Sequence, residues 1–282
     1  MFNPDKNLVI MAGGSSSRMK HSLADSNLNK DLIQKALKVH KALITLGKKK
    51  LPFLYYLLQN ALQAGYQNIY LIVGENDTHF NQWHNSLSKD DPLRKLAFFW
   101  VYQKIPSGYT KPLGTADALC QALMQYPLLQ KQSFTVCNGD NLYDVKSFRK
   151  LLASRTVPHA MMGYDRGGFR FDQQRIAKFA LIKTDVENYL IDIIEKPTLT
   201  EMDEYADKRG ILRVSMNIFS FFGNEIFPYL KDCPLHPERQ EKELPTAVCN
   251  CLADHPKSIR MFPIKKHLPD LTQAEDIKEF DD

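Results

Sequence analysis

The sequence predicts an α/β protein with a mostly parallel central sheet and helices on both faces. Short apolar runs alternate with longer segments in which apolar residues recur at helical spacing, which is typical of this class. Glycines and polar residues follow several of these runs directly, as they do where the strands of such a sheet end. No linker rich in Gly, Ser or Pro divides the chain, so we expect one domain over residues 1–282.

The first half of the chain has the pattern of repeated βα units. Buried strands are expected at residues 8–12, 69–73, 98–102 and 134–137, since each is a short apolar run. Pro52 opens a helix whose apolar residues recur at helical spacing, and Gly65 is placed to cap it. A second helix is expected at about residues 115–124.

The second half of the chain is predicted to be richer in strands. We expect strands at residues 160–163, 176–182, 189–194 and 212–221, with the middle two paired as a hairpin. Helices are expected at residues 223–230, 242–252 and 273–280. A further helix at residues 31–39 could be a lid, an oligomer contact or a packed surface helix without function.

Composition is that of a soluble globular protein, with 44% hydrophobic and 24% charged residues. The net charge of +5 is mildly basic, and Lys48 to Lys50 form the only pure basic run. A nucleic-acid-binding protein usually concentrates such charge on one stripe, so no nucleic-acid partner is expected. A small anionic substrate is equally compatible with this charge.

The cysteines and the N-terminus indicate a cytoplasmic protein. Five cysteines lack the spacing of a disulfide framework, and Cys249 and Cys251 have no second ligand pair for zinc. The first apolar run is too short for a signal peptide, and no stretch approaches the roughly 20 apolar residues of a membrane span. We therefore expect reduced thiols and no membrane partner.

A loop rich in glycine and serine follows the first strand. It consists of Ala12, Gly13, Gly14, Ser15, Ser16, Ser17 and Arg18. Backbone N–H groups of such a loop can wrap phosphates, and the arginine adds a fixed cation. It is not a Walker loop, since no Gly-Lys-Ser/Thr follows, and it lacks a glycine of the dinucleotide fingerprint. Taken alone, the loop is equally compatible with a simple turn.

Two later segments place this loop in a wider pattern. Residues 40–43 read His-Lys-Ala-Leu, and residues 51–58 read Leu-Pro-Phe-Leu-Tyr-Tyr-Leu-Leu. In this order the three segments resemble the sugar nucleotidyltransferase family, whose signature is Ala-Gly-Gly…Arg, Pro-Lys-x-Leu and Pro-Leu-Leu. His40 replaces the family's proline, and the gap between Arg18 and Lys41 is longer than is typical.

Segments on the nucleotide side continue the resemblance. Residues 112–119 are similar to the family's Leu-Gly-Thr-Ala element, which implies that Gly114 and Thr115 contact the base. Gln103 resembles the glutamine that uridylyltransferases use for uracil, and a local backbone contact is the alternative for it. Asp140, after Asn-Gly at a strand end, resembles the acid of the family's Gly-Asp metal site.

Segments on the acceptor side match less closely. Glu195 and Lys196 resemble the Glu-Lys-Pro element that holds the sugar and its phosphate, with a surface ion pair as the alternative. Ser215 and Asn217 occupy the position of the family's Asn-x-Gly strand, although both named residues differ. Asp270 corresponds to the acid that supplies the second metal ligand in the family.

The resemblance spans residues 8–277 and implies a Rossmann-like, GT-A-like fold. A nucleotide-binding half at about 1–145 would precede a sugar-phosphate-binding half at about 146–282. The implied reaction joins a sugar 1-phosphate to a nucleoside triphosphate, with UTP favoured and dTTP or CTP also compatible. In it Arg18 holds the β- and γ-phosphates, Lys41 neutralises the α-phosphate, and Asp140 with Asp270 carries Mg²⁺.

Two other functions stay open at this point. One is a cytidylyltransferase for a non-sugar phosphate such as phosphocholine, and the other is an inactive regulatory subunit that binds nucleotide sugars. Retention of Lys41, Asp140 and Asp270 argues against the inactive subunit, because such a protein has no chemical need for all three. The sugar is not identified by the sequence, and neither is the oligomeric state, for which a homo-oligomer remains open.

Overall fold

The computed structural model describes residues 1–14, 16–24, 26, 30–195 and 197–280, and within them nine strands form one sheet. Its main order is β11-β7-β10-β6-β1-β4-β5, and β8 and β9 extend it beside β10. The strands are β1 (Asn7–Met11), β4 (Asn68–Gly74), β5 (Ala97–Gln103), β6 (Ser133–Asn138), β7 (His159–Asp165), β8 (Leu181–Thr184), β9 (Leu190–Ile194), β10 (Arg213–Phe222) and β11 (Ile259–Ile264).

The centre of the sheet is parallel. Strands β6, β1, β4 and β5 all run in one direction, and β10 joins β6 in the opposite direction. This mostly parallel sheet confirms the predicted fold class. Strand β1 has β4 on one side and the later β6 on the other, so the strand order reverses there. In open α/β sheets, ligands bind at the carboxyl ends of strands beside such a reversal.

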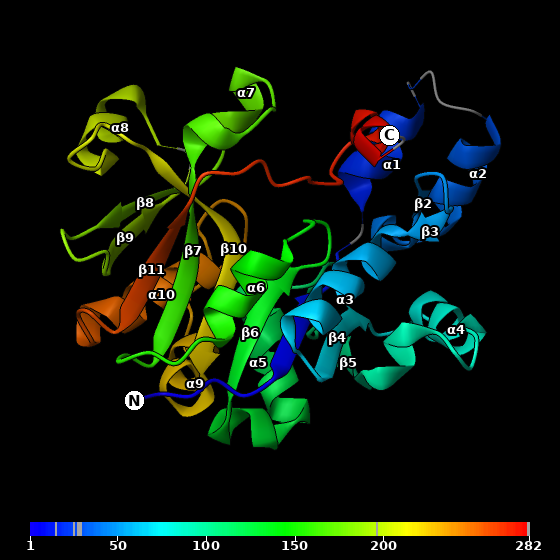
Figure 1. The fold of residues 1–282 in the computed structure, drawn as a ribbon, viewed down its shortest axis with the longest axis horizontal. Coiled ribbons are helices and arrows are strands. Elements are labelled where there is room, and N and C mark those ends of the chain that lie inside the picture. The colour runs from blue at the N-terminus through cyan, green and yellow to red at the C-terminus, as the bar shows by residue number, and fades with distance from the viewer. Residues whose placement is uncertain (15, 25, 27–29, 196, 281–282) are drawn as a thin grey trace.

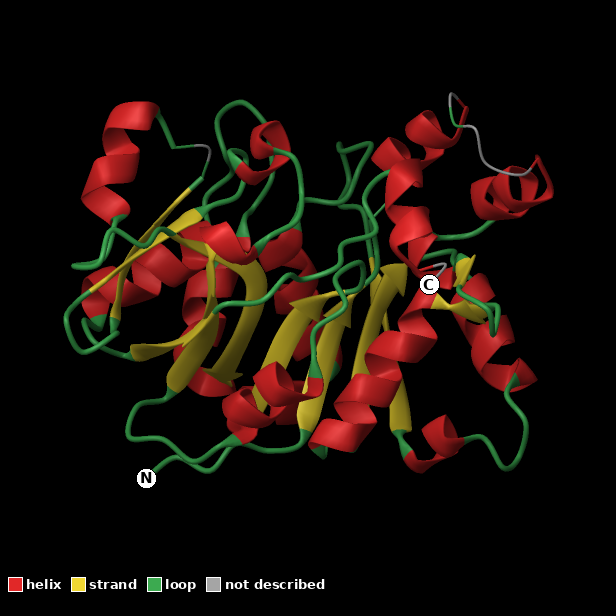
Figure 2. Cartoon of the chain, turned by 45° about the horizontal axis from the view of Figure 1, so that its top comes forward, coloured by secondary structure: helices red, strands yellow, loops and turns green. Residues whose placement is uncertain are grey.

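Helices cover both faces of the sheet, as Figures 1 and 2 show. One face carries α3 (Phe53–Ala64) and α6 (Val145–Leu152), and the other carries α5 (Thr115–Gln125), α9 (Gly223–Lys231) and α10 (Leu244–Asp254). Leu8 and Ile10 of β1 pack in the core with α3 and α6, whereas Val9 packs in the core with α5. Because both faces are buried, the central strands are continuous apolar runs.

The remaining elements are short. They are α1 (Ser17–Ala24), α2 (Lys30–Lys38), α4 (His79–Ser86), α7 (Gln173–Ile176), α8 (Leu199–Tyr205), the 3₁₀ helices η1 (Lys41–Leu43), η2 (Pro92–Lys95), η3 (Pro127–Lys131), η4 (Arg166–Gly168) and η5 (Ala274–Phe280), and the paired strands β2 (Thr45–Leu46) and β3 (Leu51–Pro52). Among the described residues, no helix is long and apolar enough to cross a membrane.

The predicted elements of the first half agree with the structure to within one or two residues. In the second half, the strand predicted at 176–182 is wrong over most of its length, because α7 ends at Ile176 and β8 begins at Leu181. Asp172 causes the difference, since its carboxylate accepts a hydrogen bond from the backbone N of Arg175 and starts the helix. The predicted hairpin is present as β8 and β9, and the helix predicted at 273–280 is the 3₁₀ helix η5.

The edge strand β5 is protected by side chains of α5. Gln125 exchanges two hydrogen bonds with the backbone of Tyr102, and Gln121 does the same with Lys104. These contacts satisfy outward-facing backbone groups that would otherwise be free to pair with another strand. They also fix the backbone on both sides of Gln103, the last residue of β5.

The C-terminal segment returns across the carboxyl edge of the sheet. After β11 the chain passes the loop that follows β6, and η5 then packs against α1 (Figure 1). The backbone N of Leu142 donates to the carbonyl of Pro269, and that of Leu271 donates to Asp140. One sheet therefore spans both halves, and the segment after β11, residues 265–280, crosses its carboxyl edge; we call this segment the strap. The single-domain assignment stays a prediction.

Candidate active site

A cavity of about 720 Å³ opens at the carboxyl ends of β1, β4, β5 and β6. Its position is the one expected for ligands at a reversal of strand order. The predicted site residues that line it are Gly13, Gly14, Ser16, Ser17, Arg18, Lys41, Gln103, Gly114, Thr115 and Asp140. Ala12 lies behind this wall, where it is buried and donates its backbone N–H to Ile72. Ser15 lies outside the described residues.

The glycine-serine loop is held in shape by its own neighbours. Ser16 has a left-handed backbone (φ 56°), and its carbonyl accepts from the backbone N of Lys20, in the first turn of α1. The hydroxyl of Ser16 accepts a hydrogen bond from the backbone N of Lys41 at 3.1 Å. A Cβ on Gly13 would lie 2.8 Å from Oε1 of Gln103, so a larger residue would displace the end of that side chain. The loop is thus joined directly to the lysine segment and to β5.

Lys41 lies inside the cavity despite the long segment that precedes it. Its Nζ forms an ion pair with Oδ2 of Asp140, and the two side chains are only 13% and 20% exposed. Lys38, a lysine of the long segment before Lys41, is exposed on α2. The structure therefore brings together Lys41 and Asp140, two of the three residues predicted to be catalytic. The third, Arg18, is exposed at the cavity wall.

His40 stabilises the segment that carries Lys41. Its backbone (φ −65°, ψ 144°) has the φ value that a proline ring imposes, and the family has proline at this position. Its Nδ1 accepts from the backbone N of Ala42 at 3.2 Å, and its ring packs 5.3 Å from Phe80. Burial, aided by the charge of Lys41, lowers the pKa of His40 to about 4, so the ring is neutral.

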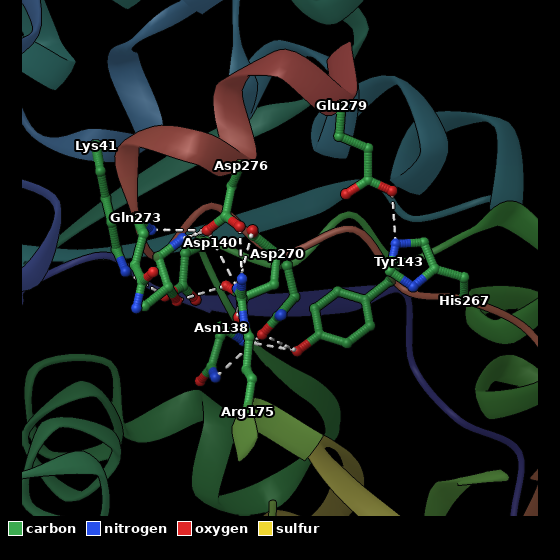
Figure 3. A network of polar contacts seen from close by, with 12 residues as sticks. Lys41, Asn138, Asp140, Tyr143, Arg175, His267, Asp270, Gln273, Asp276 and Glu279 are labelled. Atoms are coloured by element: carbon green, nitrogen blue, oxygen red, sulfur yellow. Dashed lines mark hydrogen bonds and ion pairs between the residues drawn. The ribbon is translucent and has the colours of Figure 1, made fainter. Parts of the chain in front are cut away.

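The strap brings Asp270 beside Asp140, as Figure 3 shows. An antiparallel bridge pairs Asn141 with Asp270, so two acids distant in sequence lie on adjacent backbone segments. Asp270 is 7% exposed, and its Oδ1 accepts from the hydroxyl of Thr272 at 2.7 Å. Burial and the charge of Asp140 raise the pKa of Asp270 above its ordinary range. The two carboxylates therefore repel each other, and a cation between them would relieve this repulsion.

Arg175 of α7 contacts the same carboxylate from the acceptor side. Its guanidinium bonds Oδ2 of Asp270 at 2.8 Å and also pairs with Asp276 (Figure 3). Asp276 folds the strap locally, because its Oδ2 accepts from the backbone N of Thr272 and of Gln273, both at 2.7 Å. Sequence analysis missed Arg175, since nothing in its local sequence points to a partner 95 residues away.

Another part of the cavity wall is made by the residues predicted to contact a base. Gln103 is 4% exposed, and its amide nitrogen lies 3.4 Å from the carbonyl of Gly114 and 3.5 Å from Oδ2 of Asp117. The local backbone contact considered for Gln103 is thus present, while its oxygen faces Gly13. The hydroxyl of Thr115 accepts from the backbone N of Leu244, which joins this end of the cavity to α10.

Glu195, predicted to bind the acceptor, is not among the residues that line the cavity. Glu195 pairs with Arg239 at 2.7 Å, and Arg239 also pairs with Glu243 at 2.8 Å. The partner of Glu195 is therefore an arginine that sequence analysis did not select, and Lys196 lies outside the described residues. The cavity does include Glu241, two residues after Arg239, so the segment before α10 adjoins it.

Ser215 and Asn217 lie on β10 at an irregularity of the strand. The register of β10 against β7 shifts between Ser215 and Phe219, and Asn217 has a left-handed backbone (φ 51°). The carbonyl of Met216 accepts from the hydroxyl of Tyr143, which also contacts Asn141. The bulge is therefore linked to the loop that carries Asp140, although neither predicted residue reaches the cavity.

Phosphate-binding α/β proteins share the features of this site. They are a glycine-serine loop, a lysine–aspartate pair and a second acid at the carboxyl edge of a parallel sheet. The particular family follows from comparison of the sequence. The chain belongs to the nucleotidyl transferase family, which it matches over residues 7–267. This match confirms the family indicated by the sequence motifs. No match was found among curated proteins.

Solved structures with the same fold cover nearly the whole chain. One is a UDP-glucose pyrophosphorylase in complex with UDP-glucose, at a TM-score of 0.70 and 15% identity, covering 98% of this chain and 96% of that one. Another is a putative glucose-1-phosphate thymidylyltransferase from Bacillus anthracis in complex with a sucrose, at a TM-score of 0.65 and 17% identity, covering 97% and 92%. At these identities the likeness establishes the fold.

Proposed function

We propose that this chain transfers a nucleotidyl group from a nucleoside triphosphate to a sugar 1-phosphate and releases pyrophosphate. UTP is the favoured nucleotide, ahead of dTTP and CTP. The observation that supports the proposal most is the shared cavity, which places Arg18, Lys41, Asp140 and Gln103 around one space. The names of the two structural neighbours, a UDP-glucose pyrophosphorylase and a glucose-1-phosphate thymidylyltransferase, support the same acceptor class.

The phosphate end of the cavity suits the transfer of a charged group. In-line attack by the sugar phosphate on the α-phosphorus requires two polyanions to be held together, so positioning and electrostatics dominate. The N–H groups of the glycine-serine loop and Arg18 would hold the β- and γ-phosphates. Lys41 would turn from Asp140 to the α-phosphate, where negative charge grows during transfer, and no covalent bond to the protein is needed.

Asp140 and Asp270 are the residues that would hold Mg²⁺. Both are hard oxygen donors on adjacent backbone segments. Among the described residues, no group of three or more His, Cys, Asp or Glu side chains could hold a metal alone. The remaining ligands would therefore be substrate phosphates and water. Bound there, the ion would supply positive charge to the phosphate oxygens.

In the proposal the base lies against Gln103. The oxygen of Gln103 faces the cavity beside Gly13, where it can accept from N3–H of uracil or thymine. The same oxygen can accept from the amino group of cytosine, so it does not by itself separate UTP from CTP. Glu195, with Arg239, would contact the sugar and its phosphate from the acceptor side.

A substrate screen tests the proposal. Pyrophosphate release is measured for UTP, dTTP, CTP, ATP and GTP, each with a set of sugar 1-phosphates and with phosphocholine as the rival acceptor. We expect release with UTP and a sugar 1-phosphate. Better use of ATP or GTP would contradict the base assignment, and faster reaction with phosphocholine would contradict the acceptor assignment. No release from any pair would favour the inactive, nucleotide-sugar-binding subunit.

A further inference from the structure

Arg175 lies between two buried carboxylates of the strap (Figure 3). Its Nη2 is 2.8 Å from Oδ2 of Asp270, and its Nη1 is 2.5 Å from Oδ1 of Asp276. The guanidinium also lies over the ring of Phe171 at 4.0 Å. The arginine side chain is 16% exposed, and those of the two acids are 10% and 7% exposed. This pairing is therefore well shielded from water and carries more weight than a surface ion pair.

The strap also has contacts that do not involve Arg175. The backbone around Asp270 is paired with the loop after β6, and Thr272 donates to the Oδ1 of Asp270. Asp276 is fixed separately by two backbone N–H groups of the strap. Arg175 adds bonds to Asp276 and to the backbone carbonyl of Asp270, and it places positive charge on Oδ2 of Asp270, the carboxylate oxygen that the strap leaves unbonded.

Each of the two proposed metal ligands is thus paired with a cation of the chain itself. Lys41 pairs with Asp140, and Arg175 pairs with Asp270. A divalent ion that approaches the pair alone meets two positive charges and has to compete with both for the carboxylate oxygens. A triphosphate changes this balance, because its own negative charges attract Lys41 and the metal ion together.

We propose that Arg175 is a positioning residue that occupies the carboxylate of Asp270 in place of a metal ion, so that Mg²⁺ enters only with a triphosphate. The inference rests on the proposed function, since it takes Asp140 and Asp270 as the metal site. Removal of Arg175 should raise the affinity of the nucleotide-free site for a metal ion. If the role of Arg175 were only structural, its removal would lower that affinity.

Binding of Mn²⁺ alone, measured by isothermal titration calorimetry without nucleotide, tests this. The full-length Arg175→Gln variant is compared with the wild-type chain at pH 8. Because metal affinity follows the net charge of the site, we expect the Mn²⁺ dissociation constant to fall about tenfold. An unchanged or a higher dissociation constant would overturn the proposal.

Two matched variants separate charge from shape. Arg175→Lys keeps the positive charge, so its Mn²⁺ affinity should stay close to that of the wild type. Arg170→Gln removes an exposed arginine from the same segment and should also leave the affinity unchanged. Tighter binding in Arg170→Gln would mean that any lost charge has this effect, which would contradict a specific role for Arg175.

A second pair of variants controls for a folding defect. Arg175→Gln leaves the buried Asp276 without its cationic partner, although two backbone N–H groups still bond it, so the same substitution is also made in Asp276→Asn. In that background Asp270 is the only acid released, and Mn²⁺ should again bind more tightly than in the single Asp276→Asn variant. Equal affinities would overturn the inference. None of these titrations uses substrate, so failure of the proposed reaction appears separately, as lack of wild-type turnover.

Discussion

In the proposed reaction, Lys41 is the side chain on which transfer depends most directly. It is nearly buried and already contacts Asp140, so it can act on the α-phosphate without a large movement. We expect Lys41→Ala to lower kcat about 10²- to 10³-fold, as for other lost transition-state contacts, and to weaken nucleotide binding much less. Steady-state kinetics with a nucleotide titration measures both, and Lys38→Ala is the control. A larger loss in Lys38→Ala would assign the role to that lysine instead.

Asp140 carries the charge that the proposed metal site needs. Asp140→Asn keeps the shape of the side chain but removes a negative charge, and should cost several kcal/mol of transition-state stabilisation. The same variant should bind Mn²⁺ more weakly in the presence of nucleotide. Turnover is measured by pyrophosphate release, and Mn²⁺ binding by electron paramagnetic resonance. Full activity of Asp140→Asn would rule out this metal site.

At the scale of elements, the N-terminus of α5 depends on close contact with the segment before α10. Gly114 has a left-handed backbone (φ 99°), and a Cβ there would lie 2.7 Å from the carbonyl of Lys242. Gly65 has a similar φ of 109° but no neighbour within 4 Å, so Gly65→Ala measures backbone strain alone. Gly114→Ala should cost about 1–3 kcal/mol more than Gly65→Ala, because of overpacking and because the backbone of Gly114 (φ 99°, ψ −169°) lies in a region that essentially only glycine adopts.

Urea unfolding of the two glycine variants gives this difference in the free energy of unfolding. The Michaelis constant for nucleotide should also rise in Gly114→Ala, since Gly114 and Thr115 belong to the cavity wall. Equal losses of stability would show that the two segments are not in contact, and the description of this end of the cavity would have to change.

The helices and strands that local sequence signals determine could be predicted from the sequence. Strand β1 is an unbroken apolar run followed by glycines, and α3 is closed by Gly65, so each carries its own signals. Helix α7 was missed because Ile176, Phe179 and their neighbours suggest a strand, whereas the single cap from Asp172 decides the conformation. The pairing of Arg175 with Asp270 depends on the whole fold, and no local pattern reveals it.

At the scale of the whole molecule, buried neutral histidines make stability depend on pH. Burial, chiefly, lowers the pKa of His159 to about 3, and its Nδ1 accepts from the backbone N of Phe222. Its unfolded pKa is about 6.5, so below that pH the unfolded chain binds more protons than the folded one. The free energy of unfolding should therefore fall by about 1.4 kcal/mol per pH unit for this residue as pH drops from about 6 towards 4.

Chemical denaturation between pH 7 and 4 measures this slope in the wild type and in His159→Asn. The asparagine oxygen can still accept from Phe222, but it does not titrate, so the variant should show a shallower decline. Identical slopes would contradict the assignment of a neutral, acid-sensitive histidine. Above pH 7 the two proteins should respond to pH in the same way.

The central claim is that the bond between the α- and β-phosphates is broken while the sugar phosphate takes the α-phosphorus. Radiolabelled UTP tests it directly, with ³²P placed at either the α or the γ position and the products separated after reaction with a sugar 1-phosphate. The account predicts that the α label appears in the nucleotide sugar and the γ label in pyrophosphate. Release of the γ label as inorganic phosphate, or transfer of that label to the sugar, would contradict it.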